Sequence, residues 1–279
     1  MKPTLVFAHA NSYPAACYRR LFAHWQAAGY RVLALPQFGH HPDHPVDRNW
    51  QSLVDELLAF MTAELDPDAP RILVGHSLGG LLSLMAAARR HQAVQAVQGV
   101  LMLDSPYVSG WRATLLRLAQ LSGRTQRQPP ASVARQRRAH WPDTDALQAH
   151  FSAKPLFQAW HPEVLQDYLH HGFEPDPQRG GLRLVFRPEV EAQIYATVPA
   201  ELPRLTAALT RPMAFIAGQH SREMRMGGIQ ATRRRVGALY REIEGSHLFP
   251  FEHPDRTAAL SLELLRALSE AGGPDRRPG

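Results

Sequence analysis

The residue best placed to do chemistry is a serine between two glycines. Gly75-His76-Ser77-Leu78-Gly79 has the form G-x-S-x-G and lies between a short apolar run and an apolar segment with helical spacing. A strand that turns directly into a helix crowds the positions two residues either side of the serine, and glycine relieves that crowding. The turn exposes the Ser77 hydroxyl at a helix N-terminus, where the Leu78 amide can stabilise an oxyanion. The motif predicts nucleophilic attack on a carbonyl group, and an ordinary strand–helix turn is the alternative.

A serine hydroxyl is a weak nucleophile at neutral pH and needs a general base. His247 follows the last predicted strand and precedes the last helix, where the base belongs in the chain order serine, acid, histidine. His253 is the weaker competitor for this role. The run His40-His41-Pro42-Asp43-His44 could form a metal site, but without a periodic scaffold it is interpreted as a solvated loop. We expect the chemistry to need neither a metal nor an organic cofactor.

The elements that must position these residues alternate between strand and helix, which is typical of parallel strands joined by crossover helices. The predicted strands are 4–8, 31–35, 71–74, 99–103, 213–217 and 238–243, and the predicted helices are 15–28, 50–65, 78–91, 223–235 and 254–268.

The alternation stops between Pro106 and Pro212, where helical stretches are broken by proline and glycine. About 105 residues are too many for a loop inside a compact sheet, so they are predicted to form a subdomain. A chain of 279 residues with 44% hydrophobic content can form one large domain with such an insertion. The predicted division is a core, first part, at 1–105, a helical cap at 106–211, a core, second part, at 212–270, and a flexible tail at 271–279.

Three motifs in order make the chain resemble the α/β-hydrolase superfamily over nearly its whole length. His9-Ala10-Asn11 is similar to the family's His-Gly-x turn, the G-x-S-x-G motif matches its nucleophile elbow, and His247 has the Gly-x-His-x-x-Pro-x-Glu-x-Pro setting of its base. The resemblance implies that the amides of Asn11 and Leu78 form the oxyanion hole. It also implies a mostly parallel sheet of about six strands, without the family's usual first two strands, and a cap inserted after Asp104.

The acid departs from the commonest family pattern. Most relatives carry it in a Gly-x-x-Asp turn after the cap, but the corresponding stretch here is Gly218-Gln219-His220-Ser221, which has no carboxylate. Haloalkane dehalogenases carry the acid at the end of the strand before the cap, which corresponds to Asp104. We therefore assign Asp104 as the acid and Glu223 as the fallback, with a serine–histidine dyad left open. A cap for the following turn is the structural alternative for Asp104.

The nucleophile narrows the reaction class. Haloalkane dehalogenases and epoxide hydrolases of this superfamily use an aspartate where this chain has Ser77. The resemblance implies a serine hydrolase that cleaves a carboxylic ester of a small-molecule substrate through an acyl-enzyme. One alternative is a thioesterase or carbon–carbon bond hydrolase with an anionic substrate. A second is a non-enzymatic binding protein that retains the fold.

The net charge of +6 and the pI of about 9.9 have a local origin. Residues 105–142 contain seven arginines and no Asp or Glu. They could recognise an anionic substrate, nucleic acid or an anionic membrane, but the favoured interpretation is a solvated cap surface. Without a nucleic-acid motif or an apolar stretch long enough to span a bilayer, we expect no nucleic-acid partner and no stable membrane insertion. The seven arginines of this segment are Arg112, Arg117, Arg124, Arg127, Arg135, Arg137 and Arg138.

The single cysteine, Cys17, favours a reducing, cytoplasmic compartment.

Overall fold

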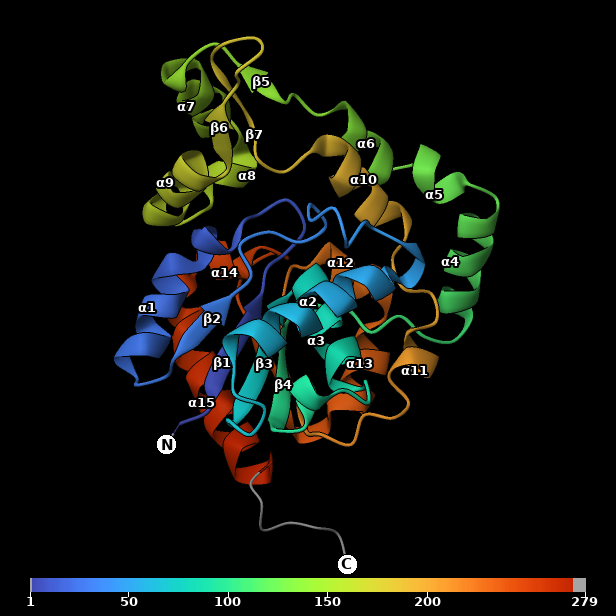
Figure 1. Ribbon diagram of the computed structural model, residues 1–279. Helices are drawn as coiled ribbons and strands as arrows, with labels where there is room; N and C mark the ends of the chain where they lie inside the picture. Colours follow the sequence, from blue (N-terminus) through green and yellow to red (C-terminus); the bar gives the residue numbers. More distant parts are fainter. Residues whose placement is uncertain (1, 273–279) are drawn as a thin grey trace, which may run out of the picture.

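A six-stranded parallel sheet forms the centre of the molecule in the computed structural model, which describes residues 2–272 (Figure 1). Its strand order is β2-β1-β3-β4-β8-β9, and every neighbouring pair is parallel. The predicted fold class and strand number are therefore confirmed. The strands are β1 (Thr4–Ala8), β2 (Val32–Ala34), β3 (Arg71–His76), β4 (Val97–Leu103), β8 (Met213–Gly218) and β9 (Tyr240–Ile243).

Helices cover both faces of this sheet, so its central strands are apolar on both sides. Side chains alternate between two clusters: Val6, for example, faces one and Leu5 and Phe7 face the other. The first cluster includes residues of α2 and α3, and the second includes residues of α1 and α15. The core helices are α1 (Arg19–Ala27), α2 (Gln51–Glu64), α3 (Leu78–Ala87), α12 (Arg222–Gly227), α13 (Ile229–Val236), α14 (Phe249–Glu252) and α15 (Pro254–Gly272).

The segment between β4 and β8 lies over the carboxyl ends of the strands and extends down one side of the core (Figure 1). It is not purely helical, because it holds a three-stranded antiparallel sheet of order β5-β7-β6. These strands have two or three residues each, too short to show periodicity in the sequence. The elements are α4 (Trp111–Leu121), α5 (Arg124–Arg127), α6 (Ala131–Gln136), β5 (His140–Trp141), α7 (Thr144–Ser152), α8 (Pro155–Gln158), α9 (Pro162–His171), β6 (Phe173–Pro175), β7 (Leu182–Leu184), α10 (Pro188–Ala196) and α11 (Leu202–Leu205).

Two further elements differ from the sequence prediction. The helix predicted at 223–235 is divided into α12 and α13 at Gly228, whose φ of 107° is incompatible with a continuous helix. The last helix continues to Gly272, so the first two residues of the predicted flexible tail are helical, and 273–279 lie outside the described residues. Within 2–272, no helix combines the length and the apolar character needed to cross a membrane.

Candidate active site

Ser77 is the single residue between the end of β3 and the start of α3. It has φ 54° and ψ −114°, a conformation that L residues rarely adopt. A Cβ on Gly75 would lie 2.2 Å from backbone atoms of Gly79, and a Cβ on Gly79 would lie 2.0 Å from the carbonyl oxygen of Ala8. Close approach of backbone to backbone is therefore the physical reason for both glycines of the motif. The turn aims the Ser77 side chain beyond the strand ends.

Three side chains that follow three different strands form a continuous hydrogen-bonded chain. Ser77 follows β3, Asp104 follows β4, and His247 lies in the loop after β9. His247 Nε2 lies 2.9 Å from Ser77 Oγ, and His247 Nδ1 lies 2.6 Å from Asp104 Oδ2. Because Nδ1–H donates to the carboxylate, Nε2 is left to accept the hydroxyl hydrogen of Ser77. This arrangement can deprotonate the serine as it attacks a carbonyl carbon.

Asp104 is fully buried, and two further donors hold its carboxylate. Oδ1 accepts a hydrogen bond of 2.7 Å from the Gly218 amide, and Oδ2 accepts one of 2.5 Å from the Ser221 hydroxyl. Ser221 is the fourth residue of the Gly-x-x-Asp-like stretch in which the acid is missing. That stretch therefore supplies donors to a carboxylate on the neighbouring strand. Sequence reasoning overlooked Ser221, although a hydroxyl at the position of the missing carboxylate was a usable signal.

Glu223, the fallback acid, lies farther from the histidine. Its Oε2 is 4.0 Å from His247 Nδ1, and its side chain is 43% exposed, whereas that of Asp104 is inaccessible. Glu223 Oε2 also lies 3.4 Å from the Ser221 hydroxyl, whose hydrogen points to Asp104 at the shorter distance. The geometry therefore favours Asp104 as the direct partner of His247, while Glu223 adds negative charge nearby.

The protonation of His247 reflects two opposing effects. Burial alone would lower its pKa, but the hydrogen bond and the negative charge of Asp104 outweigh burial and raise the pKa above its usual value. The charges of Glu223 and Glu252 act in the same direction. The imidazolium that would form after proton transfer from Ser77 is thus stabilised by its surroundings.

The turn after β1 carries Asn11, one of the two predicted oxyanion donors, and Asn11 lines the same cavity as Ser77. The Ala10 amide is occupied, because it donates to the Tyr18 hydroxyl over 3.1 Å. Within residues 2–272, no acceptor engages the amide of Asn11 or that of Leu78, the first residue of α3. The Asn11 side chain donates to the carbonyl oxygen of Glu191 over 3.2 Å and so ties the turn to α10. Leu78 directly follows Ser77 and Asn11 lines the same cavity as Ser77, so the two amides remain the candidates for stabilising a developing oxyanion.

A buried hydrogen-bond relay joins this turn to the loop that carries His247. His76 Nε2 donates to the carbonyl oxygen of His247 over 2.9 Å, which leaves Nδ1 to accept from the Tyr18 hydroxyl over 2.7 Å. Burial holds the pKa of His76 well below its usual value, so this ring is neutral. Sequence reasoning identified neither His76 nor Tyr18, because residues 58 positions apart give no spacing signal.

A second local contact shapes the loop that carries His247. Glu252 Oε2 accepts from the Ser246 amide over 2.8 Å, and its other oxygen accepts from the Ser246 hydroxyl. That hydroxyl accepts from the Leu248 amide over 3.0 Å. Glu252 is the glutamate of the Gly-x-His-x-x-Pro-x-Glu-x-Pro motif, so its place in the motif has a physical explanation: directly and through the Ser246 hydroxyl, it fixes the residues on both sides of His247.

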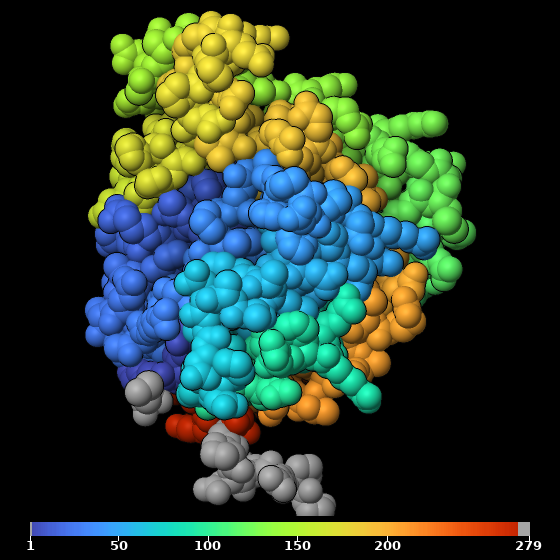
Figure 2. All heavy atoms as spheres, in the orientation of Figure 1, coloured from blue at the N-terminus to red at the C-terminus, as the bar shows by residue number. Residues whose placement is uncertain are grey.

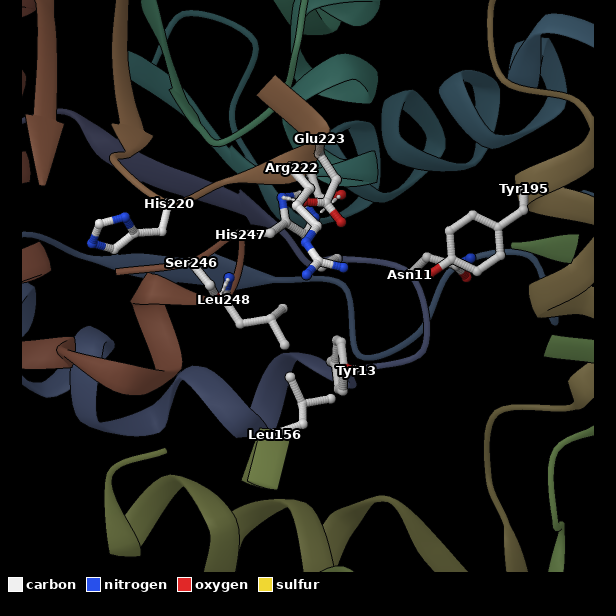
Figure 3. A pocket seen from close by; sticks show the side chains of 12 residues that line it. Asn11, Tyr13, Leu156, Tyr195, His220, Arg222, Glu223, Ser246, His247 and Leu248 are labelled. Atoms are coloured by element: carbon white, nitrogen blue, oxygen red, sulfur yellow. Dashed lines mark hydrogen bonds and ion pairs between the residues drawn. The ribbon is translucent and has the colours of Figure 1, made fainter. Parts of the chain in front are cut away.

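A cavity of about 330 Å³ opens onto Ser77 and is bounded by core and cap residues (Figure 3). Tyr13, Leu156 and Leu248 gather on one side of it, and Arg222 and Glu223 lie beside His247 on another. Its size is that of a small-molecule site. Leu156 comes from α8, so the cap contributes directly to the cavity wall. The remaining lining residues are Ala10, Asn11, Tyr195, His220 and Ser246.

Comparison with family models places this chain in a family. A family model described as the alpha/beta hydrolase family matches residues 5–260. The chain belongs to this family. No match was found among curated proteins.

Solved structures of other hydrolases resemble this alpha/beta hydrolase along nearly its whole length. E-2-(acetamidomethylene)succinate hydrolase is 20% identical, with a TM-score of 0.72 over 95% of this chain and 92% of that one. The thioesterase domain from the curacin biosynthetic pathway is 17% identical, with a TM-score of 0.70 over 94% and 91%. A structure from a study of carboxylesterases of the thaumarchaeon Nitrososphaera gargenis is 20% identical, with a TM-score of 0.66 over 96% and 92%. At these identities the likeness concerns the fold.

The arginine-rich segment of this alpha/beta hydrolase contributes no residue to the cavity. Arg137 is partly buried and pairs with Glu191 over 2.5 Å, while Arg138 lies over the ring of Trp141. The cation that does line the cavity is Arg222 on α12, which sequence reasoning did not select. Its guanidinium points into the cavity, and within the described residues it forms no ion pair (Figure 3).

One group of side chains has the atoms of a metal site. Ligand atoms of Asp104, Glu223 and His247 all lie within 4.8 Å of one another. His247 Nδ1 and Asp104 Oδ2, however, are directly hydrogen-bonded to each other, and Nε2 faces Ser77. A cation at this point would replace the contact that orients the imidazole, so we interpret the group as an acid–base pair with an additional carboxylate.

Proposed function

We propose that this alpha/beta hydrolase is a serine hydrolase that cleaves a carboxylic ester through an acyl-enzyme on Ser77. The observation that carries the proposal is the unbroken chain from Ser77 Oγ through His247 to Asp104, with contacts of 2.9 and 2.6 Å, at the wall of a cavity of ligand size. A binding protein that had lost catalysis would not need this chain, so the same distances argue against that alternative.

In the proposed reaction, His247 removes the proton of Ser77 as its oxygen attacks the ester carbonyl. The amides of Asn11 and Leu78 stabilise the oxyanion, and Asp104 holds the imidazole and stabilises its charge. His247 then protonates the leaving alcohol, and the acyl group remains on Ser77. Water activated by His247 attacks the acyl-enzyme and releases the acid, which returns the serine to its starting state.

Labelling by a fluorophosphonate probe tests this proposal. We expect the probe to modify Ser77 and to be excluded from Ser77→Ala, which should also lose at least about 10³-fold in short-acyl ester hydrolysis. Ser83→Ala is a matched control, because Ser83 is buried within α3 and does not line the cavity. Full hydrolysis by Ser77→Ala would overturn the proposal.

One observation favours a second candidate, a hydrolase for an anionic substrate such as a carboxylate-bearing thioester or a compound with a cleavable carbon–carbon bond. Arg222 presents a guanidinium to the cavity, and no carboxylate among residues 2–272 pairs with it. The names of two similar structures fit such a substrate: one is a hydrolase of a succinate derivative, and the other is a thioesterase domain. If an anionic substrate is preferred, Arg222→Gln should raise its KM about tenfold and leave that of a neutral ester unchanged. An equal change in KM for the anionic substrate and for the neutral ester would exclude this candidate.

A further inference from the structure

An apolar stripe on α4 is exposed to solvent. Trp111, Leu115, Leu118 and Leu121 are 64%, 54%, 56% and 66% exposed, and no residue of this helix is buried. Their spacing of four, three and three residues places them on one helix face. On the other side, Gln120 donates to the carbonyl oxygen of Val198 over 2.7 Å, which anchors α4 to the protein. The stripe therefore faces away from the molecule.

Four arginines surround this stripe. Arg112 and Arg117 lie on either side of it on α4, and Arg124 and Arg127 lie on the adjoining α5. None of the four forms an ion pair with any part of residues 2–272, and the segment 105–142 contains no acidic residue. Four large exposed apolar side chains in one row are unusual on a monomer and indicate an interaction site.

The place of α4 and α5 in the fold suits a flat partner. Both helices lie at the outer edge of the molecule, to the right in the two views (Figure 1, Figure 2). The start of α4 adjoins α12, because Trp111 and Arg112 line one surface hollow with Arg225 and Gly227. The other end of α12 supplies Arg222 and Glu223 to the catalytic cavity. A partner bound along the stripe would thus lie next to the element that forms a wall of the active site.

We propose that the α4–α5 surface docks on an anionic lipid membrane. Trp111 and the leucines of the stripe enter the boundary between headgroups and acyl chains, and the flanking arginines bind lipid phosphates. An apolar helix face with basic flanks is the pattern of helices that lie in the plane of a membrane. Nucleic acid would engage the arginines but leave the row of apolar side chains without a role. A symmetric contact with a second copy would bring two arginine-rich surfaces together without an acidic counterpart.

Vesicle co-sedimentation of the full chain tests the proposal. We expect binding to phosphatidylcholine vesicles that contain about one third phosphatidylglycerol, and little binding to phosphatidylcholine alone. Trp111→Ser/Leu118→Ser should weaken binding at least tenfold, and Arg117→Gln/Arg124→Gln about 20-fold, since each basic residue contributes several-fold. These side chains are exposed, so the variants should keep the melting temperature and the fluorophosphonate labelling of the parent chain.

The matched control is Arg90→Gln/Arg256→Gln, which removes the same charge from exposed positions elsewhere and should change binding less than threefold. Equal binding to neutral and anionic vesicles would overturn the proposal, as would unchanged binding by the Trp111/Leu118 variant. Binding to duplex DNA in place of vesicles would identify a nucleic-acid surface. A dimer that is lost in the Trp111/Leu118 variant, without vesicle binding, would identify a second copy as the partner. None of these outcomes depends on the identity of the ester.

Discussion

The strand-end site around Ser77 and the α4–α5 surface are built on opposite principles. Ser77 and Asp104 have positive φ values of 54° and 45°, and both side chains are hydrogen-bonded to His247, with Asp104 fully buried. In α4 the large apolar side chains are more than half exposed, and the Arg112 guanidinium stacks on the Trp111 ring at 4.6 Å from its centroid. A strained backbone that its surroundings hold in place can fix the positions of reacting atoms. An exposed amphipathic helix can only provide a surface for binding. The same substitution should therefore have very different effects in the two regions.

The largest contrast is expected when a charge is removed from each region. Asp104→Asn should lower kcat/KM for a short-acyl ester about 10³- to 10⁴-fold, because the amide loses the charge and no longer enforces the tautomer of His247. Arg117→Gln should change it less than about twofold, because Arg117 is exposed and does not line the cavity. Steady-state kinetics of the two variants provides the measurement.

The substitution Glu223→Gln distinguishes the roles of the two carboxylates near His247, those of Asp104 and Glu223. With Glu223 Oε2 4.0 Å from Nδ1, its loss should cost less than about tenfold in kcat/KM. A larger loss in Glu223→Gln than in Asp104→Asn would show that the acid has been assigned to the wrong residue.

The next contrast concerns glycine in the two regions. Gly79→Ala places a methyl group 2.0 Å from the carbonyl oxygen of Ala8, so it should lower the free energy of unfolding by more than about 3 kcal/mol. Gly123, between α4 and α5, has φ 69° and open space around its Cβ position. Gly123→Ala therefore meets only the backbone strain and should cost about 1 kcal/mol. Urea denaturation checks both values, and equal losses would contradict the proposed difference in packing.

The smallest contrast is in pH dependence. Only neutral His247 can act as the base, so kcat/KM should fall about tenfold per pH unit below its pKa. Asp104 and Glu223 raise that pKa, which places the loss of activity at a higher pH than for an ordinary histidine. Glu223→Gln removes one raising charge and should move the acid limb to lower pH by a few tenths of a unit. Arg117→Gln should leave the profile in place, and an equal displacement by both variants would contradict a local effect.

The core of the fold and the nucleophile proposed here were predictable from the sequence because both predictions depend on local physics. Alternating apolar runs and helical patterns predicted the six parallel strands. Gly75 and Gly79 pointed to Ser77 because a close backbone approach tolerates no side chain. The break at Gly228 and the strands β5, β6 and β7 were missed, because a single positive φ and strands of two or three residues leave no periodic signal.

Only the tertiary structure determines which residues that are distant in the sequence come into contact. Ser221 and Gly218 donate to Asp104 from another strand, and Tyr18 contacts His76 across 58 positions, pairings that depend on strand order and not on spacing. The sequence also located the arginine excess in residues 105–142, but the direction of each side chain depends on packing. In the folded chain Arg137 turns inward to Glu191, Trp111 faces solvent, and the cation at the cavity is Arg222 from α12. Local patterns set residue types and elements, whereas only packing determines which face of an amphipathic segment meets the core.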